Sequence, residues 1–362
     1  MNRGADTPEV LRFALVGCGR IARRHSELLG SGAIAGAELV AVCDSDTSKA
    51  ETLGELYNVP YFGEIEEMMT AGPAIDVVSV LTESGRHAEN VIEVARYGKH
   101  IVVEKPMALT LADADQMIEA CAESGSRLFV VKQNRFNVPI VKTRMALEEG
   151  RFGQLVMGTV RVRWCRRQEY YDESAWRGTW AWDGGVLTNQ ASHHIDVLEW
   201  MMGDVESVFA KSTTALVDIE VEDTAVVILK FTSGALGVIE ATTATRPTDL
   251  EGSLSILGEK GAVEVGGFAL NEMKTWRFED STEEDARVLE EFSVNPPDVY
   301  GYGHRAYYDH VVSCVRSGEK QLVDGLEGRR SLELISAIYE SVETGREVHL
   351  RFKPQECRLG IR

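Results

Sequence analysis

Short apolar runs alternate with stretches of helical periodicity along the first ~140 residues of the chain. Runs rich in valine, isoleucine and leucine are typical of strands that are buried on both faces of a sheet. The stretches between them place apolar residues three and four positions apart, as amphipathic helices do. The expected strands are residues 13–16, 38–44, 75–82, 100–106 and 127–134. Strands that alternate with helices at this spacing predict a doubly wound parallel sheet.

The pattern changes beyond residue ~140, where long segments alternate apolar and polar residues with a period of two. Such alternation, interrupted by glycine turns, predicts a large open sheet, mostly antiparallel, with one covered face. The segments that show it are residues 155–164, 205–217, 223–244 and 252–267. Helical patterns follow at 138–153, 193–203, 303–318 and 327–345, and a closing strand is expected at 347–352. The last helices are expected to return toward the first sheet.

The composition is that of a globular protein with a strongly acidic balance. Hydrophobic residues make up 44% of the chain, charged residues 26%, and the net charge is -19. A chain this acidic is repelled by nucleic acid and by anionic membranes, so neither is expected as a partner. No apolar stretch approaches the length of a membrane span, and residues 1–10 lack the apolar core of a signal peptide.

The six cysteines are scattered along the chain without a Cys-x-x-Cys pair. This spacing argues against a zinc ribbon and against a disulfide framework. We therefore expect buried thiols and a reducing, cytoplasmic location.

The sequence Gly17-x-Gly19-x-x-Ala22 lies between the first strand and the first helix, where a dinucleotide-binding turn belongs. Gly17 permits the tight turn, Gly19 lets the backbone approach a pyrophosphate, and the small Ala22 lets the helix pack on the sheet. Asp44 ends the second strand and can accept hydrogen bonds from the hydroxyls of an adenosine ribose. It would repel a 2′-phosphate, which favours NAD over NADP. The alternative is that Asp44 is an ordinary turn residue.

Polar residues end several of the predicted strands. In doubly wound sheets, ligands bind at the carboxyl ends of the strands, and Thr82, Lys105 and Gln133 occupy such ends. Glu104 and Lys105 end an otherwise apolar strand, and buried charges are costly unless they are paired or functional. We expect this pair beside a nicotinamide ring, with Pro106 fixing the backbone and able to adopt a cis bond. The alternative is that the strand ends there and its charges reach water.

These observations divide the chain into three parts. We expect a disordered tail at residues 1–10, an NAD-binding Rossmann domain at 11–137, and a second domain of α+β type at 138–362, which the family resemblance described below implies to be the substrate-binding and oligomerisation domain. The residues expected to contact NAD are Gly17, Cys18, Gly19, Arg20, Ile21, Asp44, Thr82, His87, Glu104, Lys105 and Gln133.

Three motifs together resemble the Gfo/Idh/MocA family, named for glucose-fructose oxidoreductase and inositol dehydrogenase. They are FALVGCGRIARRH, VVSVLT with His87 a few residues later, and above all VVEKPMALT. The resemblance extends over nearly the whole chain. It implies an NAD-dependent dehydrogenase that acts on a CH–OH group, with Lys105 as a catalytic residue. It also implies a homo-oligomer, dimer or tetramer, formed through the exposed face of the C-terminal sheet.

Two adjacent histidines, His193 and His194, begin the helix predicted at 193–203. They point roughly 100° apart on a helix, so at most one faces the cleft. A structural histidine is one alternative to a catalytic one. A metal site with Asp196 is another, but two ligands are too few to hold zinc or iron well, and no metal is expected.

The family pattern places two glycines, then an aspartate, then the catalytic histidine. By that resemblance His193 is the catalytic histidine, and Asn189 stands where the aspartate is usual. Asn189 can hydrogen-bond a hydroxyl or the imidazole. Its neutrality removes a negative charge from the site, which favours an acidic substrate.

Hydride transfer from a secondary alcohol to NAD needs a base for the hydroxyl proton. His193, with a pKa near neutrality, is expected to take that proton. Lys105, protonated and partly desolvated, is expected to hydrogen-bond the same oxygen and stabilise the developing alkoxide. The spacing of the two residues leaves open which of them is the formal base.

The stretch RVRWCRRQ, with Arg161, Arg163, Arg166 and Arg167, concentrates positive charge in this acidic chain. The candidate cations for an anionic substrate are Arg163, Arg166, Arg167 and Arg177. Arginines bind phosphate and carboxylate in bidentate fashion. The alternative is that they lie on a solvated or subunit-interface face of an alternating strand. The residues expected to contact substrate are Lys105, Arg163, Arg166, Arg167, Arg177, Asn189 and His193.

Within the family, the segments VRVRWCRR and AWRGTW, together with Asn189, most resemble bacterial UDP-N-acetylglucosaminuronic acid 3-dehydrogenases. This resemblance implies a sugar-nucleotide substrate, oxidised at its 3-hydroxyl in surface-polysaccharide biosynthesis. An inositol or simple-sugar dehydrogenase, a keto-sugar reductase and an NAD-dependent glycosidase are alternatives on the same fold. A non-catalytic dinucleotide-binding regulator is the alternative of another class.

Overall fold

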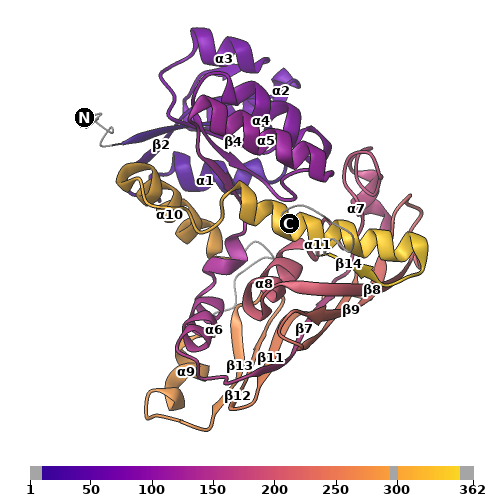
Figure 1. The fold of residues 1–362 in the computed structure, drawn as a ribbon. Coiled ribbons are helices and arrows are strands. Elements are labelled where there is room, and N and C mark those ends of the chain that lie inside the picture. The colour runs from indigo at the N-terminus through magenta and orange to yellow at the C-terminus, as the bar shows by residue number, and fades with distance from the viewer. Residues whose placement is uncertain (1–9, 294–300, 351–362) are drawn as a thin grey trace, which may run out of the picture.

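A six-stranded parallel sheet forms the N-terminal half of the computed structural model, which describes residues 10–293 and 301–350 (Figure 1). Its strands are β1 (Leu11–Val16), β2 (Ala37–Cys43), β3 (Tyr61–Phe62), β4 (Val77–Val80), β5 (His100–Val103) and β6 (Leu128–Val130). They lie in the order β3-β2-β1-β4-β5-β6, which confirms the predicted doubly wound sheet. The edge strand β3 was not predicted because two residues are too few to show a periodicity.

Helices cover both faces of this sheet, which explains why its strands are mostly apolar. They are α1 (Ala22–Gly30), α2 (Thr47–Tyr57), α3 (Ile65–Ala71), α4 (His87–Ala95) and α5 (Leu111–Ser124), with a 3-10 turn η1 (Ser84–Arg86). Phe13 and Leu15 of β1 belong to one hydrophobic cluster with residues of α1 and α2. Ala14 and Val16 belong to another with residues of α4 and α5. Each strand therefore buries alternate side chains against opposite layers of helices.

An eight-stranded sheet forms the C-terminal half, in the order β13-β12-β11-β7-β10-β9-β8-β14. Its strands are β7 (Leu155–Arg163), β8 (Val205–Thr213), β9 (Thr224–Phe231), β10 (Leu236–Thr242), β11 (Glu251–Gly258), β12 (Gly261–Gly266), β13 (Glu272–Phe278) and β14 (Val348–His349). The neighbours β7 and β10 run parallel, and the other neighbouring pairs run antiparallel. The prediction of a large, mostly antiparallel sheet is confirmed.

Helix α8 (Ser192–Met202) packs on the inner face of this sheet and is buried at every position except Trp200. The outer face carries the exposed alternate residues of the strands, as in β9, where Val226, Ile228 and Lys230 are exposed. The remaining elements are α6 (Val138–Glu148), α7 (Gln168–Asp172), α9 (Asp285–Glu291) and a 3-10 turn η2 (Gln133–Phe136). One covered face and one open face therefore result, as the period-two pattern predicts.

The last two long helices, α10 (Gly303–Ser317) and α11 (Gly325–Thr344), return to the first sheet. Tyr307 and Tyr308 of α10 are buried in the same cluster as Phe13, and the rings of Phe13 and Tyr308 lie 5.6 Å apart. α11 contacts α5 and β6 on one side and β8 on the other. Because residues predicted for the second domain complete the core of the first, the division after residue 137 stays a prediction.

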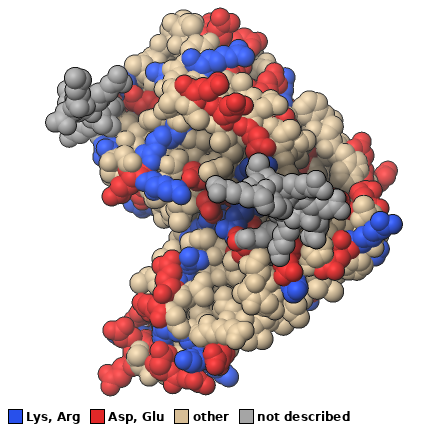
Figure 2. Space-filling model, in the orientation of Figure 1, with Lys and Arg blue, Asp and Glu red and all other residues tan. Residues whose placement is uncertain are grey.

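Acidic side chains occupy both ends of the face drawn in Figure 2, near α3 in one half and near β12 and α9 in the other. Lysine and arginine side chains form smaller groups between them. No helix within the described residues is long and apolar enough to cross a membrane. Residues 1–9 of the expected tail and the end of the closing strand predicted at 347–352 lie outside the described residues.

Candidate active site

A cleft of about 1100 Å³ runs along the carboxyl ends of the parallel strands and is bounded on its other side by the C-terminal half. Typical small-molecule sites measure roughly 300–1,000 Å³, so this cleft has room for two ligands side by side. Every residue that the sequence predicts to contact NAD lines it: Gly17, Cys18, Gly19, Arg20, Ile21, Asp44, Thr82, His87, Glu104, Lys105 and Gln133. Lys105, Arg166, Arg177, Asn189 and His193, which are predicted to contact substrate, also line it.

The glycine turn leaves room for a phosphate group. Gly17 has a φ of +95°, and a Cβ there would lie 2.7 Å from the backbone of Leu81 and Thr82. A Cβ on Gly19 would meet nothing within 4 Å, so its backbone faces open space in the cleft. No side-chain hydrogen bond caps the start of α1 at Ile21. This arrangement fits the pyrophosphate of a dinucleotide, held by backbone amides at a helix N-terminus.

Asp44 closes the turn from the side of β2. Its Oδ2 accepts a hydrogen bond from the amide of Cys18 at 2.7 Å, and its Oδ1 accepts one from the amide of Asp46 at 2.8 Å. A carboxylate has about four lone-pair sites, so two engaged amides leave capacity for ribose hydroxyls. Asp44 therefore shapes the turn and still faces the cleft.

Lys105 is anchored on a residue from the other half of the chain. Its ammonium donates to the backbone carbonyl of Asn189 at 2.8 Å and to Oδ1 of Asn189 at 3.0 Å. An ammonium has three N–H groups, so one remains to point at a substrate oxygen. Burial lowers the pKa of Lys105, and the carboxylates of Glu104 and Asp183 act against that shift. The Lys105–Pro106 peptide bond is cis.

A carboxylate from another position, Asp183, lies one side chain further from Lys105 than Asn189 does. Asn189 donates from Nδ2 to Oδ1 of Asp183 at 2.6 Å. Asp183 is 1% exposed, and burial raises its pKa to about 6. Asn189 itself is neutral, as the sequence analysis states, but a carboxylate from position 183 lies directly behind it. Asp183 was missed although it directly precedes the two glycines of the family pattern, and an acidic residue at that turn was the signal.

His193 lines the cleft from the first turn of α8. Its Nε2 lies 3.0 Å from the side-chain amide nitrogen of Gln133, and its buried Nδ1 has no hydrogen-bond partner among the described residues. Burial and the cations Lys105 and Lys132 hold the pKa of His193 well below its usual range. The expected near-neutral pKa is therefore corrected downward, and the imidazole is neutral at physiological pH.

His194 points away from the cleft, as the 100° rotation between successive helical residues requires. Its ring packs edge-on against Trp164 at 5.7 Å, and burial lowers its pKa to about 3. Asp196, the other residue of the metal alternative, binds Arg135 through both carboxylate oxygens at 2.8 and 2.9 Å. His194 and Asp196 thus belong to the core rather than to the cleft.

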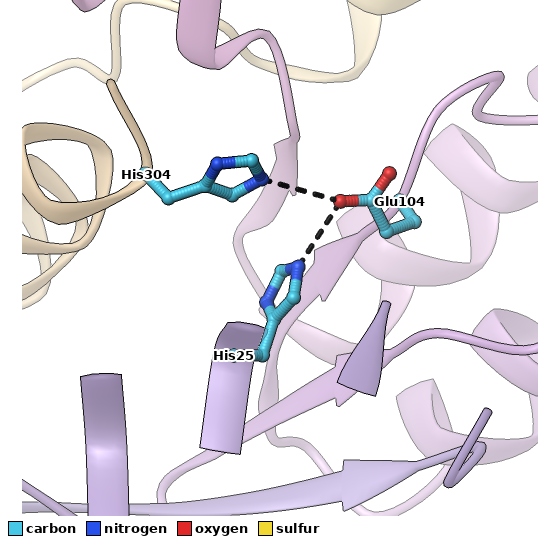
Figure 3. Close-up of side chains that lie close together, drawn as sticks. All are labelled: His25, Glu104 and His304. Atoms are coloured by element: carbon cyan, nitrogen blue, oxygen red, sulfur yellow. Dashed lines mark hydrogen bonds and ion pairs between the residues drawn. The ribbon is translucent and has the colours of Figure 1, made fainter. Parts of the chain in front are cut away.

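Glu104 is held by two histidines from distant parts of the chain (Figure 3). Its Oε1 lies 3.1 Å from Nε2 of His25 on α1 and 3.8 Å from Nε2 of His304 on α10. Its Oε2 accepts a hydrogen bond from the backbone amide of Lys105 at 2.9 Å. Burial alone would raise the pKa of Glu104, but hydrogen bonds with His25 and His304 outweigh it and keep that pKa well below its usual range. The cluster fixes the strand end that carries Lys105.

The side chains of His25, Glu104 and His304 also place potential metal-ligating atoms within 4.8 Å of one another. Both oxygens of Glu104 already take part in hydrogen bonds or ion pairs, and Nδ1 of His25 lies 2.5 Å from the hydroxyl of Tyr308. We therefore interpret the cluster as a hydrogen-bond network around the Glu104 carboxylate, in which burial lowers the pKa of His25. Nothing in the sequence links His25 or His304 to this site, because only the fold brings them to Glu104.

His87 lines the cleft, but both of its ring nitrogens face backbone carbonyls. Nδ1 lies 2.8 Å from the oxygen of Pro106 and Nε2 lies 2.9 Å from the oxygen of Thr82. The imidazole thus links the segments that follow β4 and β5. The hydroxyl of Thr82 donates to the side chain of Asn90 at 3.0 Å. The predicted cofactor contacts of His87 and Thr82 stay predictions.

Arg166 and Arg177 gather around an aromatic ring on the substrate side of the cleft. Their guanidinium carbons lie 5.6 and 4.4 Å from the ring centre of Tyr170, which also lines the cleft. Arg166 is paired with Asp249 at 3.0 Å and Arg177 with Glu173 at 2.6 Å. Tyr170 was not predicted, since a lone tyrosine carries no spacing signal.

Arg20 reaches this group from the glycine turn. Its guanidinium lies 3.8 Å from the carboxylate of Glu173, so Glu173 lies between Arg20 and Arg177 across the cleft. Nε of Arg177 is buried and has no hydrogen-bond partner among the described residues. The site therefore offers guanidinium groups to an anionic ligand at the meeting point of the two halves.

Arg163 and Arg167 do not line the cleft, contrary to the sequence-based expectation. Arg163 forms a bidentate pair with Glu240 at 2.6 and 2.7 Å and contacts Glu251 at 2.9 Å. Val162 points into the core, so its neighbour Arg163 must point to the outer face of the sheet. Arg163 thus fits the alternative given above, in which the arginines lie on a solvated or subunit-interface face of the strand. Arg167 lies at the start of α7 and contacts the exposed carbonyl of Pro247 at 3.5 Å.

Comparison with protein families gives two matches that together span the described fold. The model of the Gfo/Idh/MocA "Oxidoreductase family, NAD-binding Rossmann fold" matches residues 11–132. The model of the "Oxidoreductase family, C-terminal alpha/beta domain" matches residues 144–350.

Comparison with known proteins shows similarity over nearly the whole chain. The WlbA dehydrogenase from Bordetella pertussis, solved with NADH and UDP-GlcNAcA, is 43% identical and covers 95% of this chain and 100% of its own, with a TM-score of 0.87. The WlbA dehydrogenase from Chromobacterium violaceum, in the same complex, is 43% identical, with 96% and 98% covered and a TM-score of 0.89. The myo-inositol 2-dehydrogenase of Thermotoga maritima is 30% identical over 350 residues, 94% of this chain and 98% of that protein.

Proposed function

Because the chain belongs to the Gfo/Idh/MocA family of NAD-binding oxidoreductases, we propose that it oxidises UDP-N-acetylglucosaminuronate at its 3-hydroxyl. This reaction is placed in the biosynthesis of a surface polysaccharide. The observation that carries the proposal is that one cleft brings together a proton-handling pair, Lys105 and His193, and a pair of guanidinium groups, Arg166 and Arg177. The first pair suits a secondary alcohol, and the second suits an anionic sugar nucleotide.

NAD is the cofactor that the glycine turn and Asp44 fit. The open space beside Gly19 accepts a pyrophosphate, and the free capacity of the Asp44 carboxylate accepts ribose hydroxyls. When bound there, NAD supplies the acceptor for the hydride of the carbinol carbon. The end of β5 then places Lys105 at the edge of the sheet where the reacting ring belongs.

His193 is assigned to the hydroxyl proton. Its imidazole is kept neutral by burial and by nearby cations, and the lone pair that takes the proton is assigned to Nε2, which faces the amide nitrogen of Gln133 in this structure. Lys105 is assigned to the oxygen of the same carbinol through the N–H that Asn189 does not use. An ammonium at this position stabilises negative charge as the proton leaves.

Arg166 and Arg177 are assigned to the anionic groups of the substrate. Both stack on Tyr170 and both are neutralised by carboxylates of this chain, Asp249 and Glu173. A phosphate or uronate group can replace Glu173, which is exposed, without leaving a buried charge unpaired.

Two further parts of the proposal concern assembly and location. The outer face of the C-terminal sheet exposes apolar side chains of neighbouring strands, including Phe209, Val226, Ile228 and Leu236, which supports a homo-oligomer through that face. A cytoplasmic location suits the five described cysteines, which are free thiols.

The test is turnover of a panel of sugars with NAD, followed by the near-ultraviolet absorbance of NADH. The panel holds UDP-GlcNAcA, the uncharged UDP-GlcNAc and myo-inositol. Preferred oxidation of UDP-GlcNAcA supports the proposal, and the margin over UDP-GlcNAc measures the contribution of the uronate carboxylate. Preferred oxidation of myo-inositol would indicate instead that the chain has the activity of its Thermotoga relative, a myo-inositol 2-dehydrogenase. NADH binding without turnover of any of the three would overturn the substrate assignment.

A further inference from the structure

Asp183 lies behind Asn189, outside the cleft lining, and is joined to Lys105 through the Asn189 side chain. Its Oδ1 accepts from Nδ2 of Asn189 at 2.6 Å, and its Oδ2 accepts from the amide of Gly178 at 2.9 Å. We propose that Asp183 is a positioning residue for Lys105, which it aims and keeps protonated through the amide of Asn189. This inference rests on the proposed function, since it concerns the residue that acts on the substrate oxygen.

The direction of the hydrogen bonds supports the aiming role. A primary amide has one donor end and one acceptor end, and an ionised carboxylate only accepts. Asp183 therefore holds the NH₂ end of Asn189, which turns Oδ1 toward the ammonium of Lys105 at 3.0 Å. The reverse orientation would place two donors against each other at Lys105 and two acceptors against each other at Asp183.

The burial of the three groups supports the role in protonation. Lys105 loses solvation in the cleft wall, and Asp183 is one of the carboxylates that act against the resulting fall of its pKa. The attraction is mutual, because Lys105 lowers the pKa of Asp183 against the effect of burial. Asp183 thus stabilises the charge of the Lys105 ammonium from behind the neutral amide of Asn189. It does not bind the third N–H of Lys105, which stays free for the substrate.

Asp183→Asn tests the aiming directly. The new amide still has to accept from Gly178, so it presents its NH₂ to Asn189. Asn189 then turns over and offers NH₂ to Lys105, which loses an acceptor. We expect kcat to fall roughly tenfold to a hundredfold, as for other supporting-shell changes, with the KM for NAD unchanged.

The exchange variant D183N/N189D keeps one amide and one carboxylate in the chain of contacts. The amide at position 183 donates to the new carboxylate, whose other oxygen accepts from Lys105. We expect kcat to return toward the wild-type value. Exchange that fails to raise kcat above that of D183N would overturn the proposal.

A second readout needs neither substrate nor NAD. Cyanate carbamylates only the free amine, so the pH dependence of labelling at Lys105, read by mass spectrometry of its peptide, reports the pKa of that residue. We expect D183N to move the labelling midpoint down by roughly one pH unit and the exchange variant to restore it. N189L cuts the same connection and is expected to act like D183N, which keeps the test available should D183N not fold.

Glu222→Gln is the matched control. Glu222 is a buried carboxylate behind the same loop, but it accepts from the amide of Leu187 and the hydroxyl of Tyr339. The Glu222→Gln variant should leave the labelling midpoint of Lys105 unchanged. An unchanged midpoint in both D183N and N189L would overturn the role of Asp183, whatever substrate the enzyme uses. The expected shifts of the labelling midpoint could also be found in a protein that does not oxidise UDP-GlcNAcA. That result would count against the proposed function alone and would leave the role of Asp183 standing.

Discussion

Nε2 of His193 and the side-chain amide nitrogen of Gln133 lie 3.0 Å apart, and both side chains are buried. Gln133 begins the 3-10 turn that follows β6, whereas His193 belongs to α8 of the C-terminal half. The contact therefore joins the two halves of the chain beside the reacting position. Gln133 therefore has His193 as a partner. Its place at a strand end had predicted a contact with the cofactor instead.

Gln133→Leu separates these two roles. Loss of one hydrogen bond to the imidazole leaves His193 free to rotate, and a neutral hydrogen bond is worth about 1 kcal/mol. We expect kcat to fall roughly fivefold to tenfold while the Kd for NADH, measured by fluorescence titration, stays at the wild-type value. A weakened Kd with unchanged kcat would show instead that Gln133 serves the cofactor.

Lys105→Ala is expected to separate chemistry from cofactor binding. Removal of one preorganised donor from a developing oxyanion typically costs roughly 10²–10³ in kcat. The Kd for NADH should change little, because the glycine turn and Asp44 lie at the other end of the cofactor site. Single-turnover formation of NADH measures the first quantity. Turnover at the wild-type rate would exclude Lys105 from the reaction.

The first half of the fold could be predicted because each of its signals is local. Strands buried on both faces are apolar at most positions, and the glycine turn follows directly after β1. Since the carboxyl ends of parallel strands share one edge, topology alone placed Asp44, Thr82 and Lys105 around one cleft.

The errors have two different origins. The misplacement of Arg163 was avoidable, because period-two alternation with Val162 already puts it on the outer face. Asp183 carried a signal, its place directly before the two glycines, although its contact with Asn189 depends on loop conformation. The roles of His25 and His304 were not predictable, because they depend on the return of α10 to the first sheet.

Arg177→Ala is expected to weaken substrate binding selectively. A hydrogen bond to a charged group is worth about 1.5–3 kcal/mol, so the KM for UDP-GlcNAcA should rise roughly tenfold to a hundredfold. The KM for NAD should not change. Arg96→Ala, at an exposed position after α4, is the matched control for loss of one positive charge. Equal effects of both variants would mean that only the net charge matters.

Glu222→Gln is expected to stabilise the protein at high pH. Burial raises the pKa of Glu222 to about 7, above the unfolded value near 4.5. Ionisation therefore costs stability: the free energy of unfolding falls as pH rises between these two values, by roughly 3 kcal/mol in total. Urea unfolding at pH 5 and pH 8 should show a larger advantage of the variant at pH 8. An advantage that is equal at both pH values would contradict ionisation of Glu222 in the folded state.

Ile228→Lys tests the outer face of the C-terminal sheet as the subunit interface. Ile228 is 53% exposed and pairs across neighbouring strands with Phe209 and Val238, so it lies in the middle of an apolar area. An unpaired ammonium buried in such a contact is costly, and we expect the variant to dissociate to monomers in light scattering coupled to size exclusion. Leu56→Lys is the control, because Leu56 is 69% exposed on α2, in the other half of the chain. The wild type is expected to run as an oligomer in the same measurement. A monomeric wild type, or an unchanged oligomeric mass for Ile228→Lys, would contradict the proposed interface.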